Sequence, residues 1–130
     1  MFRLVKVLNG HTQAEVRLLK RNPLVVLLPG CALTCTNGAI SAPATSDFPE
    51  YIALSPYNFS NTDKAEAILV TEDMVFKVEY TGSVTPMIGM TVGLAMRNNV
   101  VEAVTYSSSG KGTIIGLDED TGLVYVRFRK

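Results

Sequence analysis

The sequence predicts an all-β fold, either a small β-barrel or a β-tulip or sandwich-like single domain. Short apolar segments alternate with polar residues at period two, and turn residues separate these segments at intervals of roughly 8–12 residues. No helical period is sustained over several turns. Because 130 residues is an ordinary size for one domain, we expect residues 1–130 to form a single β domain.

The first third of the chain carries three apolar segments. Residues 1–10 form either an N-terminal strand or an arm that adds a strand to a neighbouring molecule. In residues 14–18 apolar and charged side chains alternate, which favours a strand over a helix. Residues 24–28 are a continuous apolar run, which ends at the strong turn signal Pro29-Gly30.

The dipeptide Asn37-Gly38 predicts a tight β-hairpin. Both residue types tolerate a positive φ, as a two-residue hairpin loop requires. Apolar residues and threonine flank the dipeptide in segments 32–34 and 39–40. We therefore expect these two segments to pair as antiparallel strands.

Residues 41–63 predict a long ordered loop. Proline, serine and asparagine dominate the segment, and only residues 51–54 have the character of a short strand. Four aromatic side chains make the segment too apolar for a flexible linker. They are candidates for a protein contact, because aromatic rings offer a large area at low entropy cost. The alternative, which stays open, is that they cap the end of the barrel. The four residues are Phe48, Tyr51, Tyr57 and Phe59.

The second half of the chain predicts six strands with a turn between successive strands. The strands are expected at residues 67–70, 74–80, 91–96, 100–106, 113–117 and 123–128. In the second of them every other residue is apolar, and the residues between face the opposite side. The apolar set is Met74, Phe76, Val78 and Tyr80, and the opposite set is Val75, Lys77 and Glu79.

The charge balance argues against nucleic acid and membrane as partners. Twelve basic and twelve acidic residues cancel, whereas a nucleic-acid-binding protein usually carries a basic excess. No apolar run approaches the roughly 18–20 residues that span a bilayer, and the first residues do not have the pattern of a signal peptide. Charged residues make up 18% of the chain, below the usual quarter, which suggests that another protein covers some of the surface.

Residues that could support catalysis or bind a metal are few. His11 is the single histidine, and it lies beside a predicted turn. In a strand, Cys31 and Cys35 would lie about 13 Å apart, beyond the roughly 7 Å that a disulfide allows. These three residues supply too few ligands for a structural zinc site. Residues 118–122 resemble the start of a calcium loop but lack its later glutamate. We expect no catalytic residues, no cofactor and no metal.

The sequence resembles the small head-decoration, or capsid-cement, proteins of tailed bacteriophages. The similarity covers about residues 24–128 and consists of turn-and-strand patterns. Its features are residues 29–33 followed by Asn37-Gly38, residues 89–94, the turn from Gly110 into residues 113–115, and the closing residues 124–128.

This resemblance implies a non-enzymatic virion protein. Such a protein binds the major capsid protein on the outer surface of the capsid, forms a homo-oligomer that is commonly a trimer, and passes through the host cytoplasm during assembly. Two alternatives remain. One is another head–tail or tail-associated β module of a phage. The other is a cellular SH3-like or OB-like barrel that binds RNA or a peptide, which residues 112–114 leading into residues 124–126 also resemble.

Overall fold

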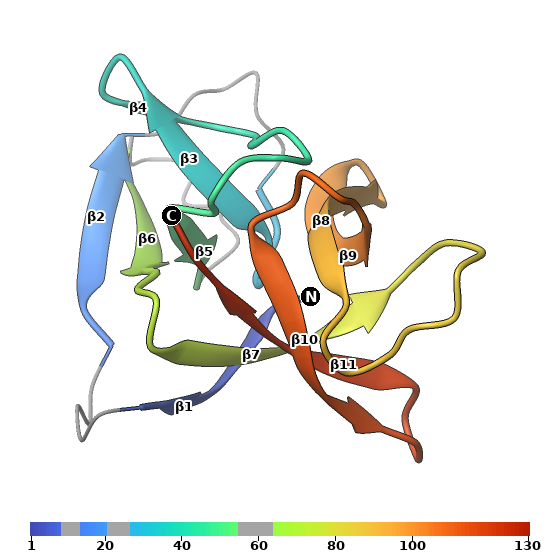
Figure 1. The fold of residues 1–130 in the computed structure, drawn as a ribbon. Helices are drawn as coiled ribbons and strands as arrows, with labels where there is room; N and C mark the ends of the chain where they lie inside the picture. The colour runs from blue at the N-terminus through green and yellow to red at the C-terminus, as the bar shows by residue number, and fades with distance from the viewer. Residues whose placement is uncertain (9–13, 21–26, 55–63) are drawn as a thin grey trace.

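The computed structural model describes residues 1–8, 14–20, 27–54 and 64–130, and every regular element among them is a β-strand (Figure 1). The prediction of an all-β fold is therefore confirmed. None of these residues belongs to a helix that could span a membrane. The strands are β1 (Arg3–Val7), β2 (Val16–Lys20), β3 (Ala32–Thr36), β4 (Ala39–Ser41), β5 (Tyr51–Ala53), β6 (Lys64–Leu69), β7 (Met74–Tyr80), β8 (Thr91–Arg97), β9 (Val100–Tyr106), β10 (Gly112–Asp118) and β11 (Leu123–Phe128).

The strands form two sheets. The larger sheet has the order β1-β7-β11-β10-β8-β9. Its last strand, β9, also pairs in parallel with β7. The smaller sheet is a closed barrel in the order β2-β4-β3-β5-β6. The barrel closes where β2 meets β4, through the parallel pair Lys20 and Ala39. Figure 1 shows the barrel on one side of the molecule and the larger sheet beside it.

Three strands of the barrel, β3, β5 and β6, are buried on both faces. In β3, Ala32 belongs to the core of the larger sheet, whereas the next residue, Leu33, belongs to the core inside the barrel. Successive residues of a strand point to opposite faces, so both faces of β3 are covered by protein. The same division separates Ile52 from Ala53 in β5, and Ala67 from Ile68 in β6.

Three phenylalanines form the centre of the larger core. Phe2, Phe76 and Phe128 lie with their ring centroids 6.0–6.4 Å apart in edge or tilted arrangements, the geometry that the charge distribution of aromatic rings favours. Phe2 precedes β1 directly, and its backbone N–H donates to the carbonyl of Gly30. β1 pairs antiparallel with β7, so the N-terminal segment forms a strand of the chain's own sheet.

The predicted tight turns are found where local chemistry specifies them. Asn37 and Gly38 have φ values of 53° and 82°, and Asn98 and Asn99 have φ values of 56° and 65°. Two successive positive values match the turn type that suits a two-residue hairpin. The strands predicted at residues 74–80, 100–106 and 123–128 have these same bounds in the structure.

The long segment after β4 is ordered in its described part. The backbone N–H of Leu94 in β8 donates to the carbonyl of Thr45, so the segment is hydrogen-bonded to the larger sheet. A local turn is closed by the Ala44 N–H, which donates to the Asp47 carboxylate over 2.7 Å. Residues 55–63 of the predicted loop, and residues 24–26 of the apolar run, lie outside the described residues.

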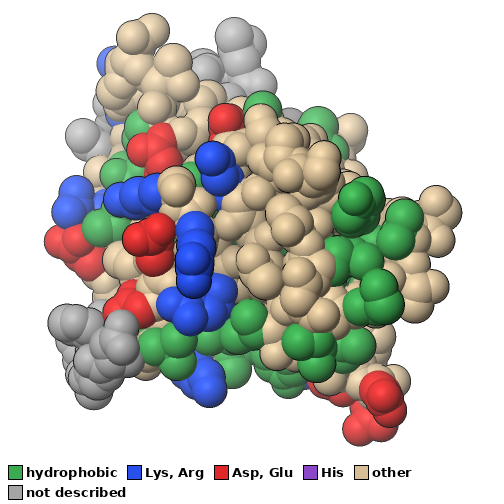
Figure 2. Space-filling model, in the orientation of Figure 1, with side chains coloured by type: hydrophobic (Ala, Val, Ile, Leu, Met, Phe, Trp, Pro, Cys, Tyr) green, Lys and Arg blue, Asp and Glu red, His purple; other side chains and the backbone are tan. Residues whose placement is uncertain are grey.

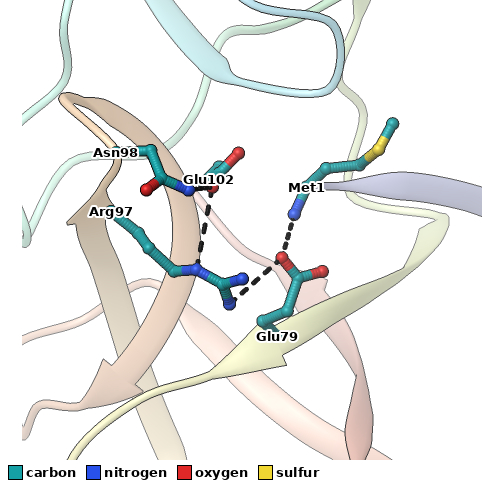
Figure 3. A network of polar contacts seen from close by, with 5 residues as sticks. All are labelled: Met1, Glu79, Arg97, Asn98 and Glu102. Atoms are coloured by element: carbon teal, nitrogen blue, oxygen red, sulfur yellow. Dashed lines mark hydrogen bonds and ion pairs between the residues drawn. The ribbon is translucent and has the colours of Figure 1, made fainter. Parts of the chain in front are cut away.

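A polar network connects the chain start to the β8–β9 hairpin (Figure 3). The Glu79 carboxylate accepts a hydrogen bond from the Met1 ammonium and lies 3.5 Å from Nη1 of Arg97. The same guanidinium lies 3.8 Å from the buried carboxylate of Glu102, to which Asn98 donates over 3.0 Å. Val100, just past the turn, packs into the core of the barrel. The hairpin thus joins the two sheets.

Candidate protein-contact surface

Two of the four aromatic candidates lie on the cores of the fold. Phe48 is half-buried against the larger core, and Nζ of Lys130 lies 5.6 Å from its ring centroid. Tyr51 is half-buried in β5 and packs against the barrel core. Tyr57 and Phe59 lie outside the described residues. In its described part the aromatic set therefore packs against both cores.

The residues considered for chemistry do not assemble into a reactive site within the described chain. Cys31 and Cys35 are free thiols, and burial raises the pKa of both, which lowers their reactivity near neutral pH. Among the side chains that the structure describes, no three histidines, cysteines or carboxylates gather as a metal site requires. His11 lies outside these residues.

The outer face of the larger sheet carries an apolar hollow of about 240 Å³. We call it the outer-face hollow. Four strands supply its lining, and Val5 and Ile115 are 47% and 40% exposed there. It is lined by Val5, Lys6, Val75, Ile115, Gly116 and Tyr125.

Two β-bulges shape this hollow. The register of β1 on β7 shifts between Leu4 and Lys6, and the register of β10 on β11 shifts between Ile114 and Gly116. A bulge inserts one extra residue into a strand and re-aims its side chain. The two residues that the shifts skip are Val5 and Ile115. Both line the hollow, although their neighbours Leu4 and Ile114 pack into the core.

The floor of the hollow is Val75. The sequence placed this residue on the face opposite Phe76, together with Lys77, and the structure agrees. Val75 is nevertheless only 2% exposed, because the walls of the hollow cover it. Gly116 keeps the hollow open: a Cβ there would lie 3.1 Å from Cδ2 of Tyr125, tighter than ordinary contact.

Cations surround the hollow in two rows across the sheet. In one row of the sheet, Arg3 of β1 lies opposite Lys77 of β7, and Lys77 lies opposite Tyr125 of β11. Lys6 pairs with Val75 in the next row. Arg127 pairs with Thr113 and donates through Nη2 to the carbonyl of Glu72 over 2.9 Å. Among the described residues no carboxylate lies in ion-pair contact with the exposed side chains of Arg3 and Lys6.

Among the described residues, Asp118 is the one carboxylate in ion-pair contact with these cations. Nζ of Lys77 lies 2.6 Å from Oδ2 of Asp118 and 5.6 Å from the centroid of the Tyr125 ring. The hydrogen bond from Lys77 is the largest cause that lowers the pKa of Asp118 from 3.8 to about 2, and it raises the pKa of Lys77. The surroundings of the hollow therefore keep a cationic excess at neutral pH, whereas Glu79, farther along β7, is paired with the Met1 ammonium and Arg97.

The ion pair predicts a specific acid dependence of stability. The pKa of Asp118 is lower in the folded than in the unfolded chain, so its stabilising contribution is present above about pH 4 and is lost as the pH falls towards 2. We expect Asp118→Asn to lower the melting temperature at pH 7, with a difference from the unmodified protein that shrinks between pH 4 and pH 2. Thermal unfolding across this range measures it. The control Asp120→Asn, in the same turn, should show no such convergence; parallel behaviour of the two variants would contradict the assignment.

A second apolar surface lies on the segment between β7 and β8. Met87 and Ile88 are 61% and 67% exposed and line a shallow groove with Met90 and Tyr106. The groove adjoins the start of β10, because the Gly89 N–H donates to the carbonyl of Ile114. Figure 2 shows hydrophobic side chains along the lower and right-hand parts of this view, beside the basic and acidic ones.

Compared with known proteins, the chain matches no family model, no curated protein and no solved structure. What it binds must therefore be inferred from the chemistry of its own surface.

Apart from Val75, which the alternation placed on the face opposite Phe76, the sequence did not single out the residues of the outer-face hollow. Val5 and Ile115 have the character of ordinary strand residues, and the pattern of alternation assigns them to no particular site. Only Gly116 in the middle of the predicted strand 113–117 carried a signal, since an internal glycine in a strand often marks a bulge.

Proposed function

We propose that this chain is a non-enzymatic decoration protein that binds the outer surface of a tailed-phage capsid and stabilises it. Its partner is the major capsid protein, and its place is the surface of the virion, which it reaches through the host cytoplasm during assembly. The sequence resemblance supplies this assignment. The outer-face hollow supports it, because an apolar depression with a charged rim has the anatomy of a protein contact.

The position of the hollow on paired strands is the observation that carries the proposal. Val5, Val75 and Ile115 lie on three strands of one sheet. The other face of this sheet is the phenylalanine core, so the hollow is fixed before a partner arrives. A preformed contact surface loses little conformational entropy on binding. Exposed apolar side chains at such a place therefore favour a binding role.

Stabilisation of the shell follows from mass action. A ligand that binds the intact lattice but not the ruptured one stabilises it by RT ln(1 + [L]/Kd), about 4 kcal/mol per site at a thousandfold excess over Kd. In the trimer that the resemblance implies, linked contacts add avidity. A moderate affinity at each hollow is then sufficient to stabilise the shell, because the stabilisation free energy per site is repeated over the many sites of a capsid.

The test is to mix the purified chain with undecorated mature capsids of the phage that encodes it. We expect co-sedimentation with the capsids, and survival of decorated capsids at temperatures that rupture bare ones. Light scattering gives the mass of the free chain and reports whether it is trimeric. Failure to co-sediment at micromolar concentration would overturn the proposal.

A matched pair of variants locates the contact. Ile115→Asp places a charge in the outer-face hollow, whereas Met96→Asp places the same charge at another exposed apolar position, 63% exposed. We expect the first variant to lose capsid binding at least tenfold, since a carboxylate in an apolar contact must be desolvated. The second should bind as the unmodified chain does. Equal loss in both would assign the contact to another surface.

A further inference from the structure

We propose that the outer-face hollow takes an apolar side chain from a partner segment that carries carboxylates on either side of that side chain. The inference rests on the proposed function for its setting, a protein partner, and adds the chemistry that the partner must present. Three features of the hollow support it: its size, its apolar walls and the sign of the charges around it.

The size and the walls point to an aliphatic anchor. At about 240 Å³ the hollow is smaller than the roughly 300–1,000 Å³ of small-molecule sites. Its floor is Val75, and its walls include Val5 and Ile115. A space of this size, lined by branched aliphatic groups, suits one or two apolar side chains. Its aliphatic floor and walls disfavour a polar group there, because Val5, Val75 and Ile115 offer that group no hydrogen-bond partner.

The charges around the hollow select acidic flanks. Lys6 lines the hollow itself, and Arg3 precedes it by one row of the sheet. Arg127 lies in β11, the strand that also supplies Tyr125, two residues farther along. Lys77 is already paired with Asp118. Carboxylates on both sides of an apolar anchor would therefore meet cations of β1 and β11.

A nucleic acid fits this face less well than an acidic peptide does. Single strands bind by stacking their bases on exposed aromatic rings. Tyr125 is the one aromatic residue of the lining, and the ammonium of Lys77 already lies 5.6 Å from its ring centroid. An aliphatic floor offers no stacking surface. The cations around the hollow thus complement carboxylates that flank an apolar side chain.

The test uses short synthetic peptides and methyl NMR of the whole chain. One peptide carries a central leucine flanked by glutamates, the second replaces the glutamates by lysines, and the third replaces the leucine by serine. We expect the first peptide to shift the methyl signals of Val5, Val75 and Ile115 in a saturable and salt-sensitive manner. The second and third should bind at least tenfold more weakly. Equal shifts with all three peptides, or none with the first, would overturn the inference.

Charge reversal gives an independent check. Lys6→Glu changes an exposed side chain and should leave the melting temperature within a degree or two. Lys6→Glu should weaken the binding of the glutamate peptide several-fold and strengthen the binding of the lysine peptide. The control Lys111→Glu changes an exposed residue outside the lining of the hollow and should alter neither affinity. If an oligouridylate shifts the NMR signals of Tyr125 and competes with the glutamate peptide at equal affinity, the hollow is a nucleic-acid site and this inference is overturned.

The outcomes separate this inference from the proposed function. A chain that binds the glutamate peptide in the hollow but does not bind capsids leaves the partner chemistry standing and removes the capsid role. If the unmodified protein and the Ile115→Asp variant decorate capsids equally well, the capsid role stands. The hollow is then not the surface that contacts the capsid.

Discussion

Replacing Phe76 by alanine is expected to destabilise the protein by about 3–5 kcal/mol, the usual cost of deleting a buried phenylalanine side chain. The ring is fully buried at the centre of the larger core, where it contacts Phe2 and Phe128 edge-on or tilted. Its removal takes away apolar burial and leaves a cavity that β-sheet walls close only partly. The free energy of unfolding in urea measures the effect.

A half-exposed aromatic residue provides the control for this prediction. Tyr106 is 50% exposed at the end of β9, so Tyr106→Ala should cost under about 1 kcal/mol. If Phe76→Ala costs no more than Tyr106→Ala, the packing of the three phenylalanines is wrong. The core variant also bears on the candidate site, because Phe76 and the floor residue Val75 are neighbours on β7.

Replacing Gly110 by alanine is the second change with a large expected effect. The residue follows Ser107–Ser109 in the turn that crosses β8, and a Cβ there would lie 2.0 Å from the carbonyl oxygen of Val92. The obstacle is backbone, which cannot rotate away as a side chain can. Either the turn lifts from β8 or the strand shifts, so we expect a loss of about 3 kcal/mol in the free energy of unfolding, at the upper end of overpacking costs.

Gly116→Ala is the matched control. This glycine also lies in backbone that alanine can adopt, and its added Cβ would contact the ring of Tyr125, a side chain that can yield by a few tenths of an ångström. We expect it to cost about 1 kcal/mol or less. Chemical denaturation of the two variants side by side tests the close approach at Gly110. Equal stabilities would show that the turn does not lie against β8 as described.

Phe76→Ala and Gly110→Ala both test the scaffold on which the candidate site depends. The outer-face hollow lies on one face of the sheet and the phenylalanine core on the other, so strand positions that the core fixes also fix the hollow. A destabilised core would therefore weaken the capsid binding that we propose, without any change in the contact residues. Binding should be measured below the melting temperature of each variant for this reason.

The sequence by itself determined the local features of this protein. Asn37-Gly38 and Asn98-Asn99 specify their turns because positive φ is a property of individual residues. The alternation in residues 74–80 specified a strand and its inward set, because a strand's side chains alternate whatever it pairs with. The Asp118–Gly122 turn between β10 and β11 was found on similar local grounds.

The alternation of apolar and polar residues predicted buried positions less well in strands that are not covered on one face only. The pattern in residues 14–18 predicted a strand, and β2 indeed covers Val16–Lys20. Yet Val16 and Leu18 are 54% and 65% exposed, and the buried residue of β2 is Leu19. In β3, consecutive Ala32 and Leu33 are both buried, since each faces a different core. Which face of a strand is covered depends on partners that lie far away in the sequence.

Only the tertiary structure decided where the outer-face hollow lies. The aromatic residues Phe48 and Tyr51 lie against the cores, whereas Val5 and Ile115, unexceptional in the sequence, form the walls of the outer-face hollow. Two bulges bring these walls together, and each bulge exists only relative to the strand on which it is paired. Turn and strand propensities belong to short segments, but a surface hollow is a property of strands paired across the whole chain.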